Sequence, residues 1–168
     1  MKKVINIFQS VTIIIGVLVV LLFLVPRIFG IIPFIVLSGS MEPGIKTGSV
    51  VFVDTNVKVK DIEAGDVIAF KVGKSQVTHR VVSVNSDNTF TTKGDANDTV
   101  DLNNVKFQNF KGKTISTIPY VGYALRLAQT KFGFLILSIL ILINLLSLFL
   151  IKDNKNEADK KNIKCKNT

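Results

Sequence analysis

Cysteine and histidine are almost absent from this chain of 168 residues, which has one of each, Cys165 and His79. Because the cysteine lies close to the last residue, a domain formed by the middle of the chain contains no disulfide bonds. Its stability must therefore come from its core. The chain also lacks internal repeats and low-complexity domains.

Charge is missing from two long apolar runs. The stretch Val11–Val25 has no charged residue, and with the apolar residues before it reaches the roughly 20 residues that a bilayer-crossing helix needs. The second run, Phe132–Ile151, is 20 residues long with only weakly polar interruptions. We therefore expect two membrane helices that bracket a central segment large enough for one small domain.

Each run has an alternative interpretation. The first could be a cleaved signal peptide, but it is long for one and no A-x-A cleavage site follows it, which favours an uncleaved anchor. Arg27 and the apolar stretch Ile28–Leu37 are expected at the outer membrane interface. The second run could be a buried core helix, but its length and the absence of a polar face argue against that.

The positive charges predict the orientation in the membrane. Lys2 and Lys3 precede the first run, and six lysines lie within the 17-residue tail 152–168. Since basic residues close to membrane helices tend to stay inside the cell, both termini are expected in the cytoplasm and the central domain outside the plasma membrane. The net charge of +9 is thus better explained by topology than by nucleic-acid binding. The polar tail is expected to be disordered.

The central segment alternates short β-prone runs with turns, which predicts a compact, mostly antiparallel β domain flanked by two transmembrane helices. The expected strands are Ser49–Asp54, Asp66–Val72, Gln76–Val84, the TFTTK run at 89–93 that forms a hairpin with the third, and Lys113–Ile118. A helix is expected over Tyr123–Lys131, leading continuously into the second membrane run. The predicted parts are 1–32 (cytoplasmic start, anchor and interfacial segment), 33–131 (catalytic β domain), 132–151 (membrane helix) and 152–168 (tail).

Three stretches carry residues suited to chemistry. The segment VLSGSMEP holds Ser38 and Ser40, the predicted strand Gln76–Val84 holds His79, and TKGDANDTVD follows the hairpin. A serine hydroxyl needs an adjacent base, histidine is well suited to that task, and a carboxylate usually orients the ring. A lone histidine is more often structural, and serines at turns are common. The carboxylate could come from Asp95, Asp98 or Asp101.

Taken together, these stretches resemble a known family. S-G-S-M-E-P at 38–43, T-H-R-V-V at 78–82 and T-K-G-D-A-N-D-T-V-D at 92–101 are similar to the successive boxes of type I signal peptidases. The similarity is to the endoplasmic-reticulum-type branch, found also in archaea and some Gram-positive bacteria, in which histidine replaces the usual lysine base. It continues through I-P-Y-V-G-Y at 118–123, but the large β insertion of the common bacterial enzymes is missing.

The resemblance implies a role for individual residues. Ser40 matches the nucleophile, His79 the general base and Asp101 the acid of the triad. Asp95 matches the aspartate of the glycine-aspartate pair, also implicated in activity, and either aspartate could be the triad acid. Ser38 is expected to help the Ser40 backbone N–H bind the oxyanion. Asp98 has no counterpart.

The resemblance also implies a reaction and its partners. A signal peptide of a secreted pre-protein would bind extended along a strand edge and be cleaved at the membrane surface, without metal or cofactor. Its small side chains would enter shallow apolar pockets, for which the candidates are Ile35, Val36, Leu37 and the face carrying Val77 and Val81. A role in the core is at least as common for such residues. The bilayer, and the secretion translocon, are the other expected partners.

Two other functions compete with this interpretation. A non-enzymatic, membrane-anchored β domain that binds exported partners would need neither the histidine nor the aspartates. A related self-cleaving or regulatory serine protease would typically use a lysine base and a single anchor. The T-H-R sequence around His79 and the two apolar runs argue against the latter.

Overall fold

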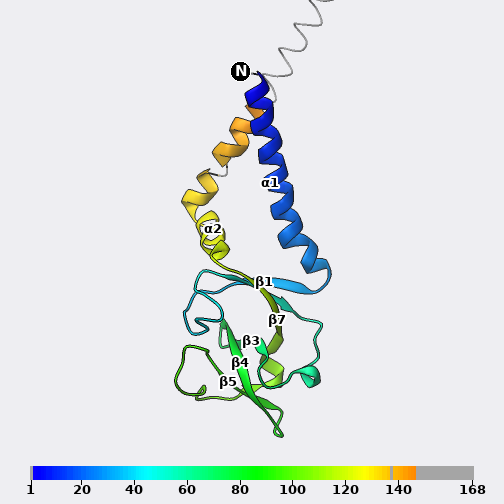
Figure 1. Ribbon diagram of the computed structural model, residues 1–168, viewed down its shortest axis with the longest axis vertical. Helices are drawn as coiled ribbons and strands as arrows, with labels where there is room; N and C mark the ends of the chain where they lie inside the picture. Colours follow the sequence, from blue (N-terminus) through cyan, green and yellow to red (C-terminus); the bar gives the residue numbers. More distant parts are fainter. Residues whose placement is uncertain (1, 137, 147–168) are drawn as a thin grey trace, which may run out of the picture. The chain divides into compact units, whose positions relative to one another are not determined.

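The computed structural model describes residues 2–136 and 138–146 (Figure 1). The chain divides into two units. One is the compact β unit Leu21–Arg126; the other comprises the N-terminal helix up to Val20 and the described residues from Leu127 onward. The tail 152–168, its Cys165 and the end of the second apolar run lie outside the described residues.

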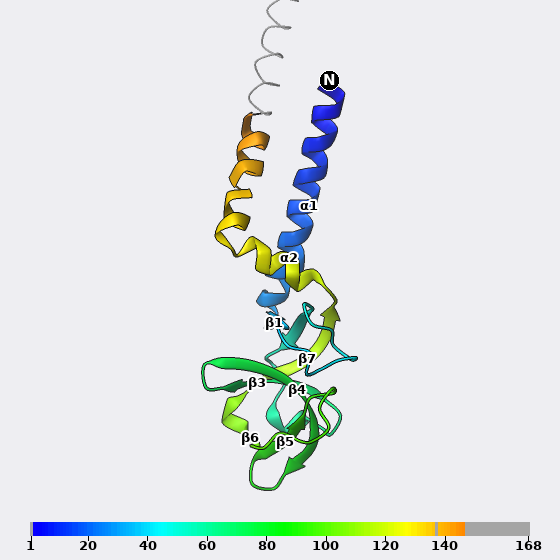
Figure 2. The ribbon, with the colours of Figure 1, turned by 90° about the vertical axis from the view of Figure 1, so that its left-hand side faces the viewer.

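The β unit is built on one seven-stranded sheet in which every neighbouring pair is antiparallel, with the order β1-β2-β7-β3-β4-β5-β6 (Figure 2). The strands are β1 (Ile31–Ile35), β2 (Val50–Asp54), β3 (Val67–Val72), β4 (Ser75–Asn85), β5 (Thr89–Lys93), β6 (Val105–Lys106) and β7 (Phe110–Ile118). Two short 3₁₀ turns, η1 (Val59–Asp61) and η2 (Phe107–Asn109), lie between strands. The predicted mostly antiparallel fold and the β4–β5 hairpin are confirmed.

Two strands were not expected, the two-residue β6 and the longer β1. The apolar stretch Ile28–Leu37, predicted to lie at the membrane interface, contains β1, which pairs with β2 from Ile31↔Asp54 to Ile35↔Val50. The ladder is prolonged by the Val36 N–H, which donates to the Ser49 carbonyl at 2.9 Å. This pairing attaches the segment before Ser40 to the sheet.

The core has two parts because side chains alternate along each strand. Ile68 and Phe70 of β3 point into one cluster, which also contains Phe90, whereas Ala69 between them points into the other. The second cluster contains Met41 and Ile45, which come from the loop after β1 rather than from a strand. Burying Met41, only 2% exposed, stabilises that loop by roughly 1.5–3 kcal/mol. The loop that carries Ser40 is thereby anchored through its neighbour.

The N-terminal helix α1 (Lys2–Ile28) contains the first apolar run. Among the described residues, one helix is by itself long and apolar enough to cross a membrane, Asn6–Ile28, with a mean hydropathy of 2.8. Its side chains are almost all exposed, as lipid-facing side chains would be and those of a buried core helix would not. An apolar N-terminal helix suited to anchoring is therefore part of the fold.

The second apolar run is helical but does not form one continuous helix with the segment before it. The helix α2 (Val121–Ala128) ends three residues before the predicted end at Lys131, and a further helix, Lys131–Leu146, follows it, with residue 137 not described. Over residues 121–136 and 138–146, which the structure describes, the two reach membrane-spanning length and hydropathy only when taken together. The predicted continuity is wrong because the Thr130 hydroxyl accepts the Gly133 N–H at 3.1 Å, a capping bond that starts a new helix. A second membrane span remains a prediction.

Candidate active site

Ser40 lies in the loop between β1 and β2, where several contacts fix the backbone. Its carbonyl accepts the Ala96 N–H at 2.9 Å, and Met41 beside it is buried. The loop is closed further on by Glu42, whose carboxylate accepts the Thr47 N–H at 3.1 Å and hydroxyl at 2.8 Å. These hydrogen bonds lower the pKa of Glu42. The hydroxyl of Ser40 is thus held on a braced turn rather than on a free loop.

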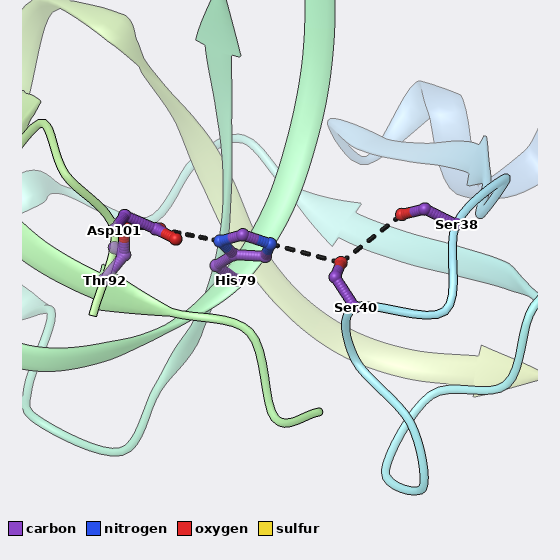
Figure 3. Close-up of polar contacts among 5 residues, drawn as sticks. All are labelled: Ser38, Ser40, His79, Thr92 and Asp101. Carbon is purple, nitrogen blue, oxygen red and sulfur yellow. Dashed lines mark hydrogen bonds and ion pairs between the residues drawn. The ribbon is translucent and has the colours of Figure 1, made fainter. Parts of the chain in front are cut away.

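His79 lies on β4 opposite Ile68 of β3, and its side chain faces Ser40. The two residues are joined by a contact of 3.1 Å between the imidazole Nε2 and the Ser40 Oγ (Figure 3). The residue is 9% exposed, and Phe70 packs edge-on against the ring at 6.1 Å between centroids. Strand pairing and this packing leave the ring little freedom to turn.

Asp101 lies on the far side of the ring. Its Oδ2 is 2.7 Å from His79 Nδ1 and also accepts the Thr92 hydroxyl at 2.6 Å. The Asp101 N–H donates to the Thr92 carbonyl at 2.8 Å, which fixes the backbone as well. A carboxylate can only accept, so Nδ1 must carry the proton and Nε2 is left to accept from the Ser40 hydroxyl. The three groups form a serine-histidine-aspartate chain in the orientation that activates a nucleophile.

Asp95 is placed elsewhere. It pairs with Arg80 through two hydrogen bonds, Nε to Oδ1 at 2.8 Å and Nη2 to Oδ2 at 2.7 Å, and does not contact His79. The same guanidinium donates to the Gly65 carbonyl at 2.8 Å. Hydrogen bonding to Asp95 raises the pKa of Arg80. This pair ties the turn that holds Asp95 to β4, next to His79.

That turn is the one that supports Ser40. Ala96, which donates to the Ser40 carbonyl, directly follows Asp95, and Gly94 precedes it. A Cβ at Gly94 would lie 2.5 Å from the Ser40 carbonyl oxygen, so only glycine fits there. Asp95 therefore acts on Ser40 through the backbone, whereas Asp101 contacts the ring. Asp98, expected to have no role, is exposed.

Ser38 completes the line of side chains in Figure 3, its Oγ lying 3.3 Å from that of Ser40. Both serines line a cavity of about 250 Å³, which we call the acyl-side groove. It is lined by Phe34, Ile35, Val36, Leu37, Ser38, Ser40, Met41, Val51, Gln76, Val77 and Thr78. The predicted pocket residues Ile35, Val36, Leu37 and Val77 are thus brought together beside Ser40.

Val81 does not belong with them. It is 1% exposed and packs in the core with Ile68 and Phe90, at the position where β4 pairs with Thr92 of β5. The alternation that puts Val77, His79 and Val81 on one face is correct, but that face passes from groove to core along the strand. Of the two roles that the sequence left open for Val81, pocket or core, the structure shows the core.

Sequence reasoning missed two participants. Thr92 was seen as the first residue of the TKGD stretch, yet its hydroxyl bond to Asp101 was not expected; a buried threonine in a polar box is the signal that could have revealed it. Arg80 directly follows the histidine, and its charge could have suggested a carboxylate partner. Within the described residues, no group of three or more His, Cys, Asp or Glu side chains is arranged to hold a metal ion.

Comparison with known proteins agrees with this geometry. A family described as signal peptidase, peptidase S26, matches residues 8–117. The chain is 38% identical over 104 residues to Signal peptidase I W of Bacillus subtilis, covering 60% of this chain and 52% of that protein. It is 38% identical over 101 residues to the signal peptidase complex catalytic subunit SEC11C of Homo sapiens, covering 52% of each.

A third relative is the SEC11 catalytic subunit of Colletotrichum graminicola, 35% identical over 101 residues, 53% of this chain and 59% of that one. The chain therefore spans about half the length of the relatives it matches. These matches confirm the resemblance carried by the three sequence boxes. With the family covering most of its length, including every residue of the serine-histidine-aspartate chain, the chain belongs to the signal peptidases of peptidase family S26.

Proposed function

We propose that this chain is a membrane-bound serine endopeptidase that cleaves signal peptides from exported pre-proteins by acyl transfer to Ser40. The observation that carries the proposal is the continuous series of contacts from Ser40 through His79 to Asp101, at 3.1 and 2.7 Å. Membership of the signal peptidase family supports the substrate class. Among the described residues, the hydrogen-bonding partners of the Ser40 Oγ are His79 and Ser38, so no lysine takes the place of the base.

The reaction follows from the positions of the protons. Ser40 Oγ attacks the scissile carbonyl carbon while His79 Nε2 takes its proton, and Asp101 stabilises the imidazolium that forms. The imidazolium then gives that proton to the leaving amine as the C–N bond breaks. A water molecule, deprotonated by the same nitrogen, attacks the ester and releases the signal peptide with regeneration of the Ser40 hydroxyl.

The negative charge of each tetrahedral intermediate needs donors. The Ser38 hydroxyl, 3.3 Å from the nucleophile, and the Ser40 backbone N–H are the groups that we assign to the oxyanion. Because the turn is held through the Ser40 carbonyl and buried Met41, these donors need little reorganisation during the reaction.

Two unpaired strand edges suggest how the substrate binds. β1 is an outer strand of the sheet, and residues 75–79 of β4 precede the point, Arg80, at which pairing with β5 begins. Both segments line the acyl-side groove. An extended signal peptide could add to these edges through main-chain hydrogen bonds, with Ile35, Val36, Leu37 and Val77 receiving its alternate side chains.

Membership of the signal peptidase family supports a requirement for small side chains before the scissile bond. A purified pre-protein with alanine at the first and third positions before the cut should be cleaved at that bond, whereas leucine at the first position should reduce kcat/KM by about 10²-fold. N-terminal sequencing of the product checks the site of cleavage. An unchanged rate with leucine would contradict the pocket assignment, and an absence of any cleavage would favour a binding domain without catalysis.

We further propose that the chain spans the plasma membrane twice, with both termini cytoplasmic and the β unit outside. The apolar helix Asn6–Ile28 and the lysines at both ends of the sequence support this arrangement. It would place Ser40 near the outer interface, where the lipid bilayer and the secretion translocon present an emerging signal peptide. Within this proposal, 1–32 is the cytoplasmic start with the anchor and the interfacial segment, 33–131 the catalytic β domain, 132–151 the second membrane helix and 152–168 the cytoplasmic tail.

Protease added to intact cells tests the orientation. A protease with specificity for exposed loops should cut the β unit but leave an epitope fused after Thr168 intact, because the tail is expected inside. Permeabilised cells, in which both should be cut, serve as control. Loss of the epitope in intact cells with a protected β unit would refute the topology.

A further inference from the structure

His79 also faces a second cavity, which is larger than the acyl-side groove that contains Ser40. It measures about 420 Å³ and lies on the other flank of the imidazole, where we call it the Asp101-side cavity. It is lined by Phe70, Val72, Val77, His79, Asn97, Thr99, Val100, Asp101, Leu102 and Asn103. The mechanism described above uses its histidine and aspartate but leaves the remaining walls without a role.

The two cavities are neighbours. Val77 lines both of them, two residues before His79 on β4. On its other side the Asp101-side cavity shares Phe70, Val72 and Asn103 with a third cavity of about 170 Å³. Cavities therefore lie on both flanks of His79, one lined by Ser40 and the other by Asp101, as an extended polypeptide bound across the site would require.

The walls of the Asp101-side cavity are mainly apolar. Phe70, 3% exposed, belongs to the core beside it, while the Leu102 side chain is fully exposed and Val100 is 46% exposed. The ionisable groups on the walls are His79 and Asp101, which are bonded to each other. Covering these exposed apolar side chains with a ligand removes them from water and lowers the free energy of the complex. The ligand best matched to them is itself apolar.

The chemistry identifies the occupant. The part of the substrate before the scissile bond lies in the acyl-side groove, and the leaving amine must reach His79 Nε2 to receive its proton. The chain after the bond therefore continues from the histidine. Since one extended residue spans about 3.3–3.6 Å, its first or second residue passes the imidazole and reaches the next cavity.

We propose that the Asp101-side cavity binds the first two residues of the mature protein, and that an apolar side chain there accelerates cleavage. This inference rests on the proposed signal peptidase function. It adds a determinant of specificity on the leaving side of the bond. Leu102 and Val100 are the residues that would contact the substrate side chain there.

A matched set of pre-proteins tests the proposal. The substrates are identical up to the scissile bond and carry Val-Val, Gly-Gly or Lys-Lys directly after it. The wild-type chain should cleave the Val-Val substrate with a kcat/KM about tenfold above that of the Gly-Gly substrate. Equal rates for all three would overturn the inference and leave the proposed function intact, whereas failure to cleave any of them would overturn both.

A change of charge at the rim gives a sharper readout. In the variant Leu102→Glu, the ratio of kcat/KM for Lys-Lys over Val-Val should rise at least tenfold, because the new carboxylate attracts the lysines. The control is Val84→Glu, on an exposed valine of β4 whose 45% exposure matches that of Val100 and which lines none of the three cavities. Because a ratio of two substrates is compared, a general loss of activity does not affect it. An unchanged ratio in Leu102→Glu would count against the proposal.

A binding measurement provides a readout that does not depend on turnover. A pre-protein with a photocrosslinking residue directly after the scissile bond is bound to the Ser40→Ala variant and irradiated. Mass spectrometry should locate the crosslink within residues 97–103, and a crosslinker placed before the bond should instead label residues 34–37. Labelling of residues 34–37 from both positions would show that the residues after the scissile bond do not enter the Asp101-side cavity, and would overturn the proposal.

Discussion

Replacing Ser40 with alanine should lower the rate of pre-protein cleavage by at least about 10⁴-fold while leaving the fold intact. The variant removes the atom that attacks the carbonyl, and neither His79 nor Ser38 can supply a substitute at the same place. Within the part of the chain that the structure describes, the hydroxyl hydrogen-bonds only to those two side chains, whereas the loop is held by the backbone of Ser40 and by buried Met41. Initial rates with purified protein, together with circular dichroism, check both halves of this expectation.

The control for Ser40→Ala is a serine of the same sheet outside the site. Ser83 donates a hydrogen bond to Asn85 at 3.0 Å, and Ser83→Ala should therefore cleave at close to the wild-type rate. Near wild-type turnover by Ser40→Ala would exclude this residue as the nucleophile. It would also revive the alternative of an anchored β domain whose processing activity comes from another protein.

The second large effect concerns the two aspartates, which sequence similarity alone does not separate. Asp101→Asn should lower kcat by about 10⁴-fold with little change in stability. If the asparagine presents its amide N–H₂ to the ring, Nδ1 must accept, and the proton moves to the nitrogen that faces Ser40. The nucleophile then has no base.

Asp95→Asn should act differently. It weakens the paired hydrogen bonds with Arg80, which costs about 1 kcal/mol of folding free energy at this partly exposed site. The turn that supports Ser40 is displaced rather than its base removed, so kcat should fall by at most about 10²-fold. Parallel thermal unfolding and kinetic assays of the two variants separate these roles. A loss in Asp95→Asn as deep as that in Asp101→Asn, at unchanged stability, would assign Asp95 to the catalytic proton transfer.

Much of the fold was accessible from the sequence because local signals were strong. The hairpin of β4 and β5 was predicted from alternation and the NSDN turn, and β2, β3 and β7 from short apolar runs ended by turn residues. β1 was missed because Ile31–Ile35 directly follows an apolar helix and carries no alternation of its own. Its strand character depends on pairing with β2, a long-range contact that no local pattern reports.

The candidate site shows the same division. The order of the boxes indicated that Ser40, His79 and an aspartate could meet, and the structure brings them within hydrogen-bonding distance. Which aspartate faces the ring depends on the tight turn closed by the Asn97 N–H bond to the Gly94 carbonyl, at 3.0 Å. That turn directs Asp95 toward Arg80 and leaves Asp101 for the histidine. Spacing along the chain cannot distinguish the two.

The open edges of β1 and of the first half of β4 have a consequence for the range of substrates. Main-chain hydrogen bonds are the same for every amino acid, so recognition through them is indifferent to sequence. Side chains of an added strand alternate between facing the protein and facing away, and those that face away are free to vary. Under the proposed function, unpaired strand edges of this kind would let one site bind many unrelated pre-proteins, provided that they share two small residues and an extended conformation.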